Sequence, residues 1–464
     1  MRAYLCPGPA VSRFLSRFLQ PTVVATAVFA FALAPVVAQQ SRSTSAVQKP
    51  TFSRAPITLP GHVIIPASSL PQKGETGIRM HTNIRIFMPD GGMPDVVSPP
   101  YSGYLWNTPQ SLACRYVLVG TVSGCNPNST VNTPSGGSQT IAIVDAYDDP
   151  SIYGDLAYFC AQMGIPFNPS NFSVVYASGY EPDVDPTGGW ELEAALDVEY
   201  AHAMAPNAKI VLVEANSNSI GDLLQGVLTA TNLVQCNSTS TCSSVTGKGE
   251  VSMSWGGAEY STESYNDSLF NNTNVVYVAS AGDVPGVQYP AASPDVISVG
   301  GTSIGRNLTT GNYQWEVAWQ STGGGVSQYE SLPTFQSAAG LTGNNRLVPD
   351  VAANADPNTG DWVFDSFPYD GFYNDGPYQS AWFVVGGTSA ATAVWSGIIN
   401  RAGSFAASST AELTKLYTDM TGASYSSDFT DIGYGTCGPV DAYQAGTKYD
   451  NCTGIGIPKN YTGK

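Results

Sequence analysis

Short apolar, often β-branched runs alternate with helical patterns along the chain from about residue 101 onward. The run 139–147 (QTIAIVDAY) is almost continuously apolar until it reaches Asp145, which is typical of a buried parallel strand. Strands that alternate with helices predict an α/β fold with a doubly wound, mostly parallel sheet and helices on both faces. Further strands are predicted at 173–178, 208–215, 249–255, 274–282, 295–301 and 382–387, and helices at 150–163, 190–204 and 220–233.

The N-terminal residues have a different pattern, that of a processing signal. Three arginines precede a mostly apolar run at 22–37, and small residues follow where a signal peptidase would cut. The run is short for a membrane span, so we predict a cleaved signal peptide over 1–38, with a retained anchor as the alternative. Residues 39–100 are rich in Pro, Ser and Thr with one strand-like run at 81–88, and we interpret them as a short leader or linker.

The composition is that of a globular, acidic protein. Apolar residues make up 42% and charged residues 12%, and the formal net charge is −17. Removal of the three arginines within 1–38 takes this charge from −17 to −20. A charge of this sign repels nucleic acid and anionic membranes. No later segment is long and apolar enough to span a membrane, so we expect a secreted, extracellular protein, and nothing indicates more than a monomer.

The eight cysteines favour an oxidising compartment over a metal site. Cys6 leaves with the signal, and no CxxC pair or histidine cluster accompanies the others. Cys160 has no near partner and is expected to be a buried free thiol on a helix face. Three pairs close in sequence are expected to form local disulfides: Cys114 with Cys125, Cys236 with Cys242, and Cys437 with Cys452.

The motif GGTS occurs twice and offers two candidate serine nucleophiles. Ser303 follows a predicted strand but leads into a loop-like stretch, and we interpret it as structural. Ser389 follows the strand 382–387 and opens a helix of small residues. At a helix N-terminus, backbone N–H groups and the helix dipole can stabilise negative charge that develops on a carbonyl oxygen. Ser389 is therefore the candidate, and the alternative is a plain N-cap serine.

A serine nucleophile needs a base, and the three histidines are poorly placed to supply one. His62 and His81 lie in the leader. His202 lies among small apolar residues and is expected to be a packed or solvent-facing helix residue. A histidine-based triad therefore has no evident base.

Carboxylates on the predicted helix 190–204 are better placed. Glu193 and Asp197 are four residues apart and share one helix face, so their carboxyl groups can share a proton and titrate as a pair. Such a pair could accept the serine proton at low pH. The alternative is an exposed acidic helix face, which is how we interpret Glu191 and Glu199.

Three segments together resemble one family, the sedolisins or serine-carboxyl peptidases, which share the subtilisin-like α/β fold. The first is the helix with Glu193 and Asp197 followed by MAPNAKI. The second runs from SWGG (254–257) through VYVASAGD to YPAASPDVISVGGTS. The third is RLVPDVAANADPNTG (346–360) followed by GGTSA (386–390). Their order agrees over residues 100–460.

The resemblance implies a secreted, acid-acting endopeptidase domain over 101–464 that cleaves polypeptides through an acyl-enzyme. It makes Ser389 the nucleophile, Glu193 the general base and acid, and Asp197 its orienting partner. Asp283 takes the oxyanion position, where a carboxyl group can donate a hydrogen bond only when it is protonated. Activity is therefore expected to fade toward neutral pH. Asp145, at the end of the first strand, extends the carboxylate network.

The resemblance also implies one structural Ca²⁺ ion near the C-terminus, held by hard oxygen ligands. Lys448 stands where the family usually has a glycine, although its backbone carbonyl remains available. The implied ligands are the carboxylates of Asp431 and Asp450 and the carbonyls of Ile432, Gly446 and Lys448.

Two further departures from the family bear on the prediction. Ala393 stands where the family usually has a proline, which affects the helix after Ser389. The leader 39–100 is far shorter than the family's folded propeptide, so it is either a reduced inhibitor and chaperone or the enzyme folds without one. Two rival functions are a hydrolase that uses His202 as its base and a catalytically inactive binding protein on the same scaffold.

Overall fold

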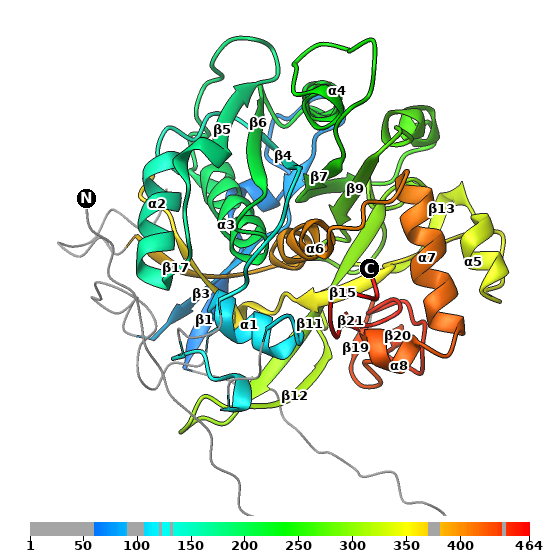
Figure 1. Ribbon diagram of the computed structural model, residues 1–464. Coiled ribbons are helices and arrows are strands. Elements are labelled where there is room, and N and C mark those ends of the chain that lie inside the picture. The colour runs from blue at the N-terminus through cyan, green and yellow to red at the C-terminus, as the bar shows by residue number, and fades with distance from the viewer. Residues whose placement is uncertain (1–59, 91–105, 120–122, 130–132, 370–380, 439–441) are drawn as a thin grey trace, which may run out of the picture. The chain divides into compact units, whose positions relative to one another are not determined.

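The central sheet determines where the candidate site lies. A computed structural model describes residues 60–90, 106–119, 123–129, 133–369, 381–438 and 442–464, and the predicted signal peptide lies outside these ranges. The strand order is β12-β11-β9-β7-β4-β6-β5, with β15 also paired to β11 (Figure 1). All pairs are parallel except β11–β12, as the alternation of strands and helices predicted. The strands are β4 (Thr140–Ala146), β5 (Phe172–Tyr176), β6 (Lys209–Ala215), β7 (Gly249–Met253), β9 (Val275–Ser280), β11 (Ile297–Arg306), β12 (Tyr313–Ala318) and β15 (Val351–Asn354).

Helices cover both faces of this sheet, so the predicted layers are confirmed. On β4, Ile141 and Ile143 join the core beneath α3 (Gly189–Met204) and α6 (Thr388–Ala402). The alternate residues Ala142 and Val144 join the core beneath α4 (Ile220–Cys236). Because successive side chains of a strand point to opposite faces, this division follows from the pleat. The helix α2 (Ile152–Met163) packs on α3.

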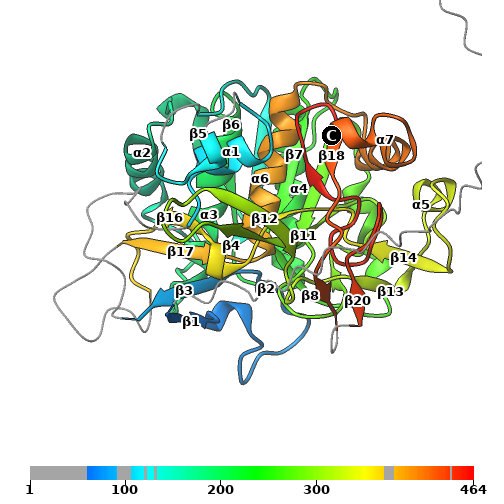
Figure 2. The ribbon, with the colours of Figure 1, turned by 90° about the horizontal axis from the view of Figure 1, so that it is seen from below.

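A second, antiparallel sheet lies beside the first and has the order β1-β3-β17-β16 (Figure 2). The assignment of 382–387 to the parallel sheet was wrong, because β17 (Trp382–Gly386) pairs antiparallel with β16 (Asp361–Phe364) and β3 (Arg85–Pro89). A buried strand carries the same apolar run in either sheet, so the sequence pattern does not distinguish them. The strand β1 (Gly61–Ile64) completes this sheet.

The remaining elements lie outside these two sheets. The strand β2 (His81–Thr82) and β10 (Gln288–Tyr289) flank β8 (Trp255–Ala258). No helix in the described ranges is long and apolar enough to cross a bilayer. The other elements are α1 (Pro109–Arg115), α5 (Thr334–Ala338), α7 (Ser409–Thr421), α8 (Tyr425–Asp428), β13 (Gly325–Ser331), β14 (Asn345–Val348), β18 (Phe429–Thr430), β19 (Thr436–Cys437), β20 (Tyr443–Gln444), β21 (Ile457–Pro458), and 3-10 turns at Ala67–Ser69, Ser123–Cys125, Pro169–Asn171, Glu263–Phe270 and Pro357–Thr359.

The cysteines lie as the sequence predicted. Cys160 is a buried free thiol on α2. The three short-range disulfides join Cys114 to Cys125, Cys236 to Cys242, and Cys437 to Cys452. Three disulfides are typical of a protein that folds in an oxidising compartment.

Candidate active site

Ser389 lies at a sharp turn between β17 and α6 and is fully buried. The turn depends on Gly387, which has a φ of 116° and precedes the helix. A Cβ atom at this position would lie 2.0 Å from the carbonyl oxygen of Asn83 and 2.7 Å from Oδ2 of Asp283. The Ser389 hydroxyl donates to the carbonyl oxygen of Ser254 at 3.1 Å, and its backbone N–H donates to the carbonyl of Asn83 at 3.2 Å.

Glu193 and Asp197 lie one turn apart on α3, which packs directly against α6. Asp197 Oδ1 accepts a hydrogen bond from the Ser254 hydroxyl at 2.8 Å. Because the carbonyl of Ser254 accepts from Ser389, this one residue contacts both the serine and the carboxylate pair. The structure therefore brings Ser389, Glu193 and Asp197 together, as the spacing on the helix and the GGTS turn had suggested.

Burial dominates the electrostatics of this carboxylate group. Glu193 and Asp197 are fully buried and Asp145 is 1% exposed. Burial raises the pKa of Glu193 well above its usual value; the charges of Asp197 and Asp145 add to the rise, and the nearby Ser389 hydroxyl opposes it. Burial, and then Asp145, raise the pKa of Asp197 in the same way. The pKa of Asp145 is raised to about 8, first by burial and then by Asp149. Asp145 therefore holds its proton into the neutral range and belongs to the network, and the raised pKa values of Glu193 and Asp197 favour a proton shared between them.

Asp283 approaches the same turn from the segment after β9. Its Oδ1 accepts from the backbone N–H of Thr388 at 2.7 Å and from the Thr388 hydroxyl at 3.0 Å. Its Oδ2 lies beside Gly387, and Arg85 Nη1 is 3.7 Å away. Burial raises the pKa of Asp283 to about 6, while Arg85 and Thr388 lower it. Below this pH the carboxyl group is mainly protonated and can donate a hydrogen bond from Oδ2 into the space beside Gly387.

The interpretation of Glu191 and Glu199 as an exposed acidic face was wrong. Both are buried, at 1% and 0% exposure. The Glu191 carboxylate accepts from the backbone N–H of Asp185 at 2.7 Å, and Glu199 accepts from the N–H of Phe364 at 3.1 Å. The reason is that α3 is enclosed on every side, so that all its residues are buried whatever their polarity. Acidic residues with internal backbone partners produce the same sequence pattern as a solvated face.

Two residues weighed as alternatives have structural roles. The stretch after Ser303 is not a loop, since β11 continues to Arg306 and the Ser303 hydroxyl donates to Asp356 Oδ2 at 2.7 Å. The second half of β11 was not predicted, because the two adjacent glycines, Gly300 and Gly301, weaken its strand pattern. His202 is buried on α3, and its Nε2 lies 3.0 Å from the carbonyl oxygen of Pro166. Burial lowers its pKa.

Three residues of the site were missed. Ser254 was noted only as part of SWGG, although its hydroxyl and carbonyl connect the serine to Asp197. Asn83 and Arg85 lie in the leader, where the strand-like run 81–88 indicated a strand but not its location. Contacts between residues about 200 or 300 positions apart have no local signal, so no pattern in the leader could have placed them.

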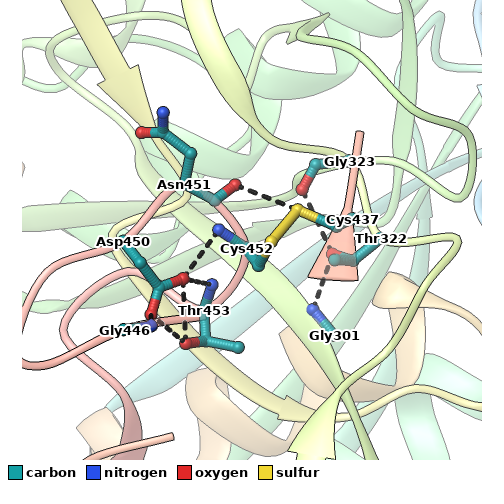
Figure 3. The surroundings of a disulfide bond; sticks show 9 residues. All are labelled: Gly301, Thr322, Gly323, Cys437, Gly446, Asp450, Asn451, Cys452 and Thr453. Carbon is teal, nitrogen blue, oxygen red and sulfur yellow. Dashed lines mark hydrogen bonds between the residues drawn. A yellow bond between two sulfur atoms is a disulfide. The ribbon is translucent and has the colours of Figure 1, made fainter. Parts of the chain in front are cut away.

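Asp450 and Gly446, two of the residues implied for a calcium site, lie beside the Cys437–Cys452 disulfide (Figure 3). Both carboxylate oxygens of Asp431 lie 3.0 Å from the backbone N–H of Lys448, and Asp450 Oδ2 accepts from the N–H of Gly446 at 3.0 Å. Lys448 has a φ of 65°, a value that suits the glycine usual in the family. Ile432, next to Asp431, is buried.

The donor set in this loop is limited to oxygen atoms. The described ranges contain no group of three or more His, Cys, Asp or Glu side chains that could hold a metal. A cation here would therefore use the carboxylates of Asp431 and Asp450 together with backbone carbonyls, a set that suits Ca²⁺. Asp450 also accepts from the N–H groups of Cys452 and Thr453 at 2.8 Å each, next to the Cys437–Cys452 disulfide.

Comparison with known proteins identifies the class. The model of the subtilase family matches residues 187–435, more than half of the chain, and the chain therefore belongs to this family. Kumamolisin from Bacillus sp. (strain MN-32) is 31% identical over 358 residues, which is 70% of this chain and 59% of that protein. Sedolisin from Pseudomonas sp. (strain 101) is 25% identical over 380 residues, 74% of this chain and 61% of that protein.

A solved structure shows the same fold. Pseudomonas sedolisin, a serine-carboxyl proteinase complexed with two molecules of pseudo-iodotyrostatin, superposes with a TM-score of 0.59 at 23% identity. The superposition covers 76% of this chain and 95% of that one. The resemblance to the sedolisins is thus confirmed, as is the subtilisin-like fold. The chain spans about six-tenths of the length of the curated relatives it matches.

Proposed function

We propose that this protein is a secreted serine-carboxyl endopeptidase that hydrolyses polypeptides in acid through an acyl-enzyme on Ser389. The observation that carries the proposal is the convergence of three elements on one buried serine. The helix α6 supplies Ser389 at its N-terminus, α3 supplies Glu193 and Asp197, and the segment after β9 supplies Asp283. The homology to sedolisins and the three disulfides support the activity and the export from the cell.

The chemistry follows from these positions. Glu193 and Asp197 hold one proton between them, which leaves a carboxylate oxygen free to accept the Ser389 proton as the serine oxygen attacks the substrate carbonyl. The N–H of Ser389 and the protonated Asp283 then donate to the oxyanion. Glu193 returns the proton to the leaving amine, and a water molecule cleaves the ester with Glu193 again as the base.

Cleavage of denatured casein between pH 2.5 and 8 tests this proposal. We expect activity that peaks below about pH 5 and is abolished in Ser389→Ala and Glu193→Gln. Ser303→Ala is the matched control, because it removes a buried serine hydroxyl from the other GGTS motif. Loss of activity in Ser303→Ala but not in Ser389→Ala would contradict the assignment of the nucleophile.

We further propose that the C-terminal loop binds one structural Ca²⁺ ion through Asp431, Asp450 and the carbonyls of Ile432, Gly446 and Lys448. Both carboxylates face the backbone of the same short loop, which supports the proposal. Chelation should lower the thermal unfolding temperature, and Ca²⁺ should restore it more effectively than Mg²⁺, which demands a stricter geometry. The calcium proposal is contradicted if chelation leaves the unfolding temperature unchanged both in the wild type and in Asp431→Asn.

A further inference from the structure

The helix α3 carries a second pair of acidic residues on the side opposite the catalytic pair. Glu191 and Glu199 flank Glu193 and Asp197 along the helix. At about 100° per residue, the mean direction of Glu191 and Glu199 is about 180° from that of Glu193 and Asp197. The side with Glu199 meets β16, where its carboxylate accepts a backbone N–H at 3.1 Å. One helix therefore presents two acidic faces, and only one of them contributes to the proposed chemistry.

Two further carboxyl groups reach this second face from neighbouring elements. Asp149 precedes α2 and Asp365 follows β16, and both elements pack against α3. The residue before Asp365 donates its N–H to Glu199, and the residue after it donates to Asp155 of α2 at 2.9 Å. Asp365 therefore lies where α2, α3 and β16 meet. We call Asp149, Glu191, Glu199 and Asp365 the back-face cluster.

Each carboxyl group of the back-face cluster has one bonded oxygen and one free oxygen. None of the four residues is more than 4% exposed. Their second oxygens are buried without a hydrogen-bond partner among the described residues, and no ion pair in that part of the chain includes them. Because buried carboxylates without cations are costly, protons must neutralise this cluster. The bonded oxygens accept backbone N–H groups, those of Ser151, Asp185, Phe364 and Phe367.

The cluster keeps its protons in acid and loses them toward alkaline pH. Burial, the largest cause, raises the pKa of Asp149 to about 7 and that of Glu191 to about 9. Burial also raises the pKa of Glu199 and of Asp365 well above the usual value, and the charge of Asp149 adds to both rises. Since folding raises these pKa values, the stability that the protons contribute is complete below about pH 4 and is lost as the pH rises through 7 to 9. The other titratable groups that face the cluster, none of them a cation, are Asp148, Asp155, Cys160, Asp185, Tyr200 and Glu214.

We propose that Glu191 and Glu199 are positioning residues, which hold Glu193 and Asp197 against α6 only while the back-face cluster is protonated. This inference rests on the proposed function. When the cluster ionises, like charges in one buried site repel one another, and α3 relieves the repulsion by moving apart from α2 and β16. Because α3 packs directly on α6, this motion displaces the catalytic pair relative to Ser389. A base out of hydrogen-bond reach of the serine cannot accept its proton.

Hydrogen–deuterium exchange of α3 in full-length Ser389→Ala tests the packing at pH 5 and pH 8, with rates divided by those of an unstructured chain at each pH. We expect the protection of α3 to fall at least about 100-fold, since each proton released by the motion couples it to pH about tenfold per unit. Added Glu199→Gln keeps an oxygen for the N–H of Phe364 and stays neutral, and should reduce the fall about tenfold or more. Glu250→Gln is the matched control, because Glu250 is fully buried with one unpartnered oxygen but lies on β7.

The pH profile of kcat/KM then connects the helix to catalysis. Asp283→Asn is the starting variant, because its side chain has no proton to lose near neutral pH. Adding Glu199→Gln should move the remaining decline to higher pH, and adding Glu250→Gln should not. Glu199→Ala lacks an acceptor for the N–H of Phe364 and should weaken the protection of α3 at both pH values, so the comparison with glutamine separates charge from packing.

The outcomes separate this inference from the proposed function. Equal protection of α3 at pH 5 and pH 8, or an equal effect of Glu199→Gln and Glu250→Gln on its fall, overturns the role of the back-face cluster. A pH profile that Glu199→Gln leaves in place overturns the positioning role. Exchange does not require cleavage, so a chain that shows the expected exchange but cleaves no casein at any pH contradicts the proposed function and the catalytic consequence, while the pH-dependent packing of α3 stands.

Discussion

Replacement of Asp283 by asparagine should separate the role of its side chain from the role of its proton. The Oδ1 atom of Asp283 accepts two hydrogen bonds from Thr388, at 2.7 and 3.0 Å. An asparagine would keep its oxygen on these donors and turn its NH₂ group to the position of Oδ2, beside Gly387. An amide donates at every pH, whereas a carboxyl group donates only when it is protonated.

The magnitude follows from the pKa of Asp283, which is about 6 with Arg85 beside it. At pH 7.5 such a group is protonated in about 3% of molecules, so the wild type should lose roughly 30-fold in kcat/KM between pH 4.5 and 7.5 from this group alone. Asp283→Asn should lack this part of the decline. Asp283→Ala should lose ~10²–10³-fold in kcat at pH 4.5, because it removes the donor.

The assay is the pH profile of kcat/KM on a fluorogenic peptide after acid treatment has run to completion. The matched control is Asp356→Asn, because Asp356 is a buried aspartate that bonds to Ser303 and lies outside the proposed site. If kcat/KM of Asp283→Asn declines toward pH 7.5 as steeply as that of the wild type, a group other than Asp283 causes the decline. Full activity of Asp283→Ala at pH 4.5 would refute the oxyanion role.

Three further outcomes are expected. Ser254→Ala removes the hydroxyl that bonds to Asp197 and should lower kcat/KM roughly 10–100-fold and shift the acidic side of the pH profile. Ser252→Ala, two residues earlier at the end of β7, should not, and equal effects of the two substitutions would contradict the positioning role of Ser254. Burial raises the pKa of Asp149 and Asp361 to about 7 and that of Glu250 to about 8, so the folded state binds these protons more tightly. The stability that these protons contribute is present in acid and is lost as the pH rises through 7 and 8. Thermal unfolding of Ser389→Ala should therefore occur at a lower temperature at pH 8 than at pH 5, and the opposite order would refute this pH dependence. Replacing Cys437 and Cys452 by alanine opens a loop with a sequence separation of 15 and should lower the free energy of unfolding by about 3 kcal/mol in denaturant. The loss should be about 2 kcal/mol for the Cys236–Cys242 pair, whose sequence separation is 6. A larger loss for Cys236–Cys242 than for Cys437–Cys452 would contradict this dependence on loop length.

Much of the fold could be predicted because its signals are local. A strand such as β4 is a continuous apolar run because helices cover both of its faces, and that run is legible in the sequence. The strand β17 has the same pattern but pairs with β3 and β16, and sheet membership depends on partners far along the chain. Helix spacing placed Glu193 and Asp197 correctly on one face, but it could not show that Glu191 and Glu199 are also buried.

The candidate site was predicted where residue type and spacing together constrain the chemistry. Ser389 stands out because a strand, two glycines and a helix of small residues surround it. Arg85 and Asn83 do not stand out, because their importance arises only when β3 pairs with β17 and brings them to Asp283 and Ser389. Contacts of this kind depend on the folded topology and have no counterpart in local sequence pattern.

The most direct test of the carboxylate-based mechanism is the kcat/KM of Glu193→Gln at pH 4, measured beside the wild type on one peptide substrate. Glutamine keeps the shape of the side chain but cannot accept the Ser389 proton, so we expect a loss of ~10²–10⁴-fold. A variant that retains wild-type activity, with a profile that peaks above pH 7, would show that another group is the base and would contradict the assignment of Glu193.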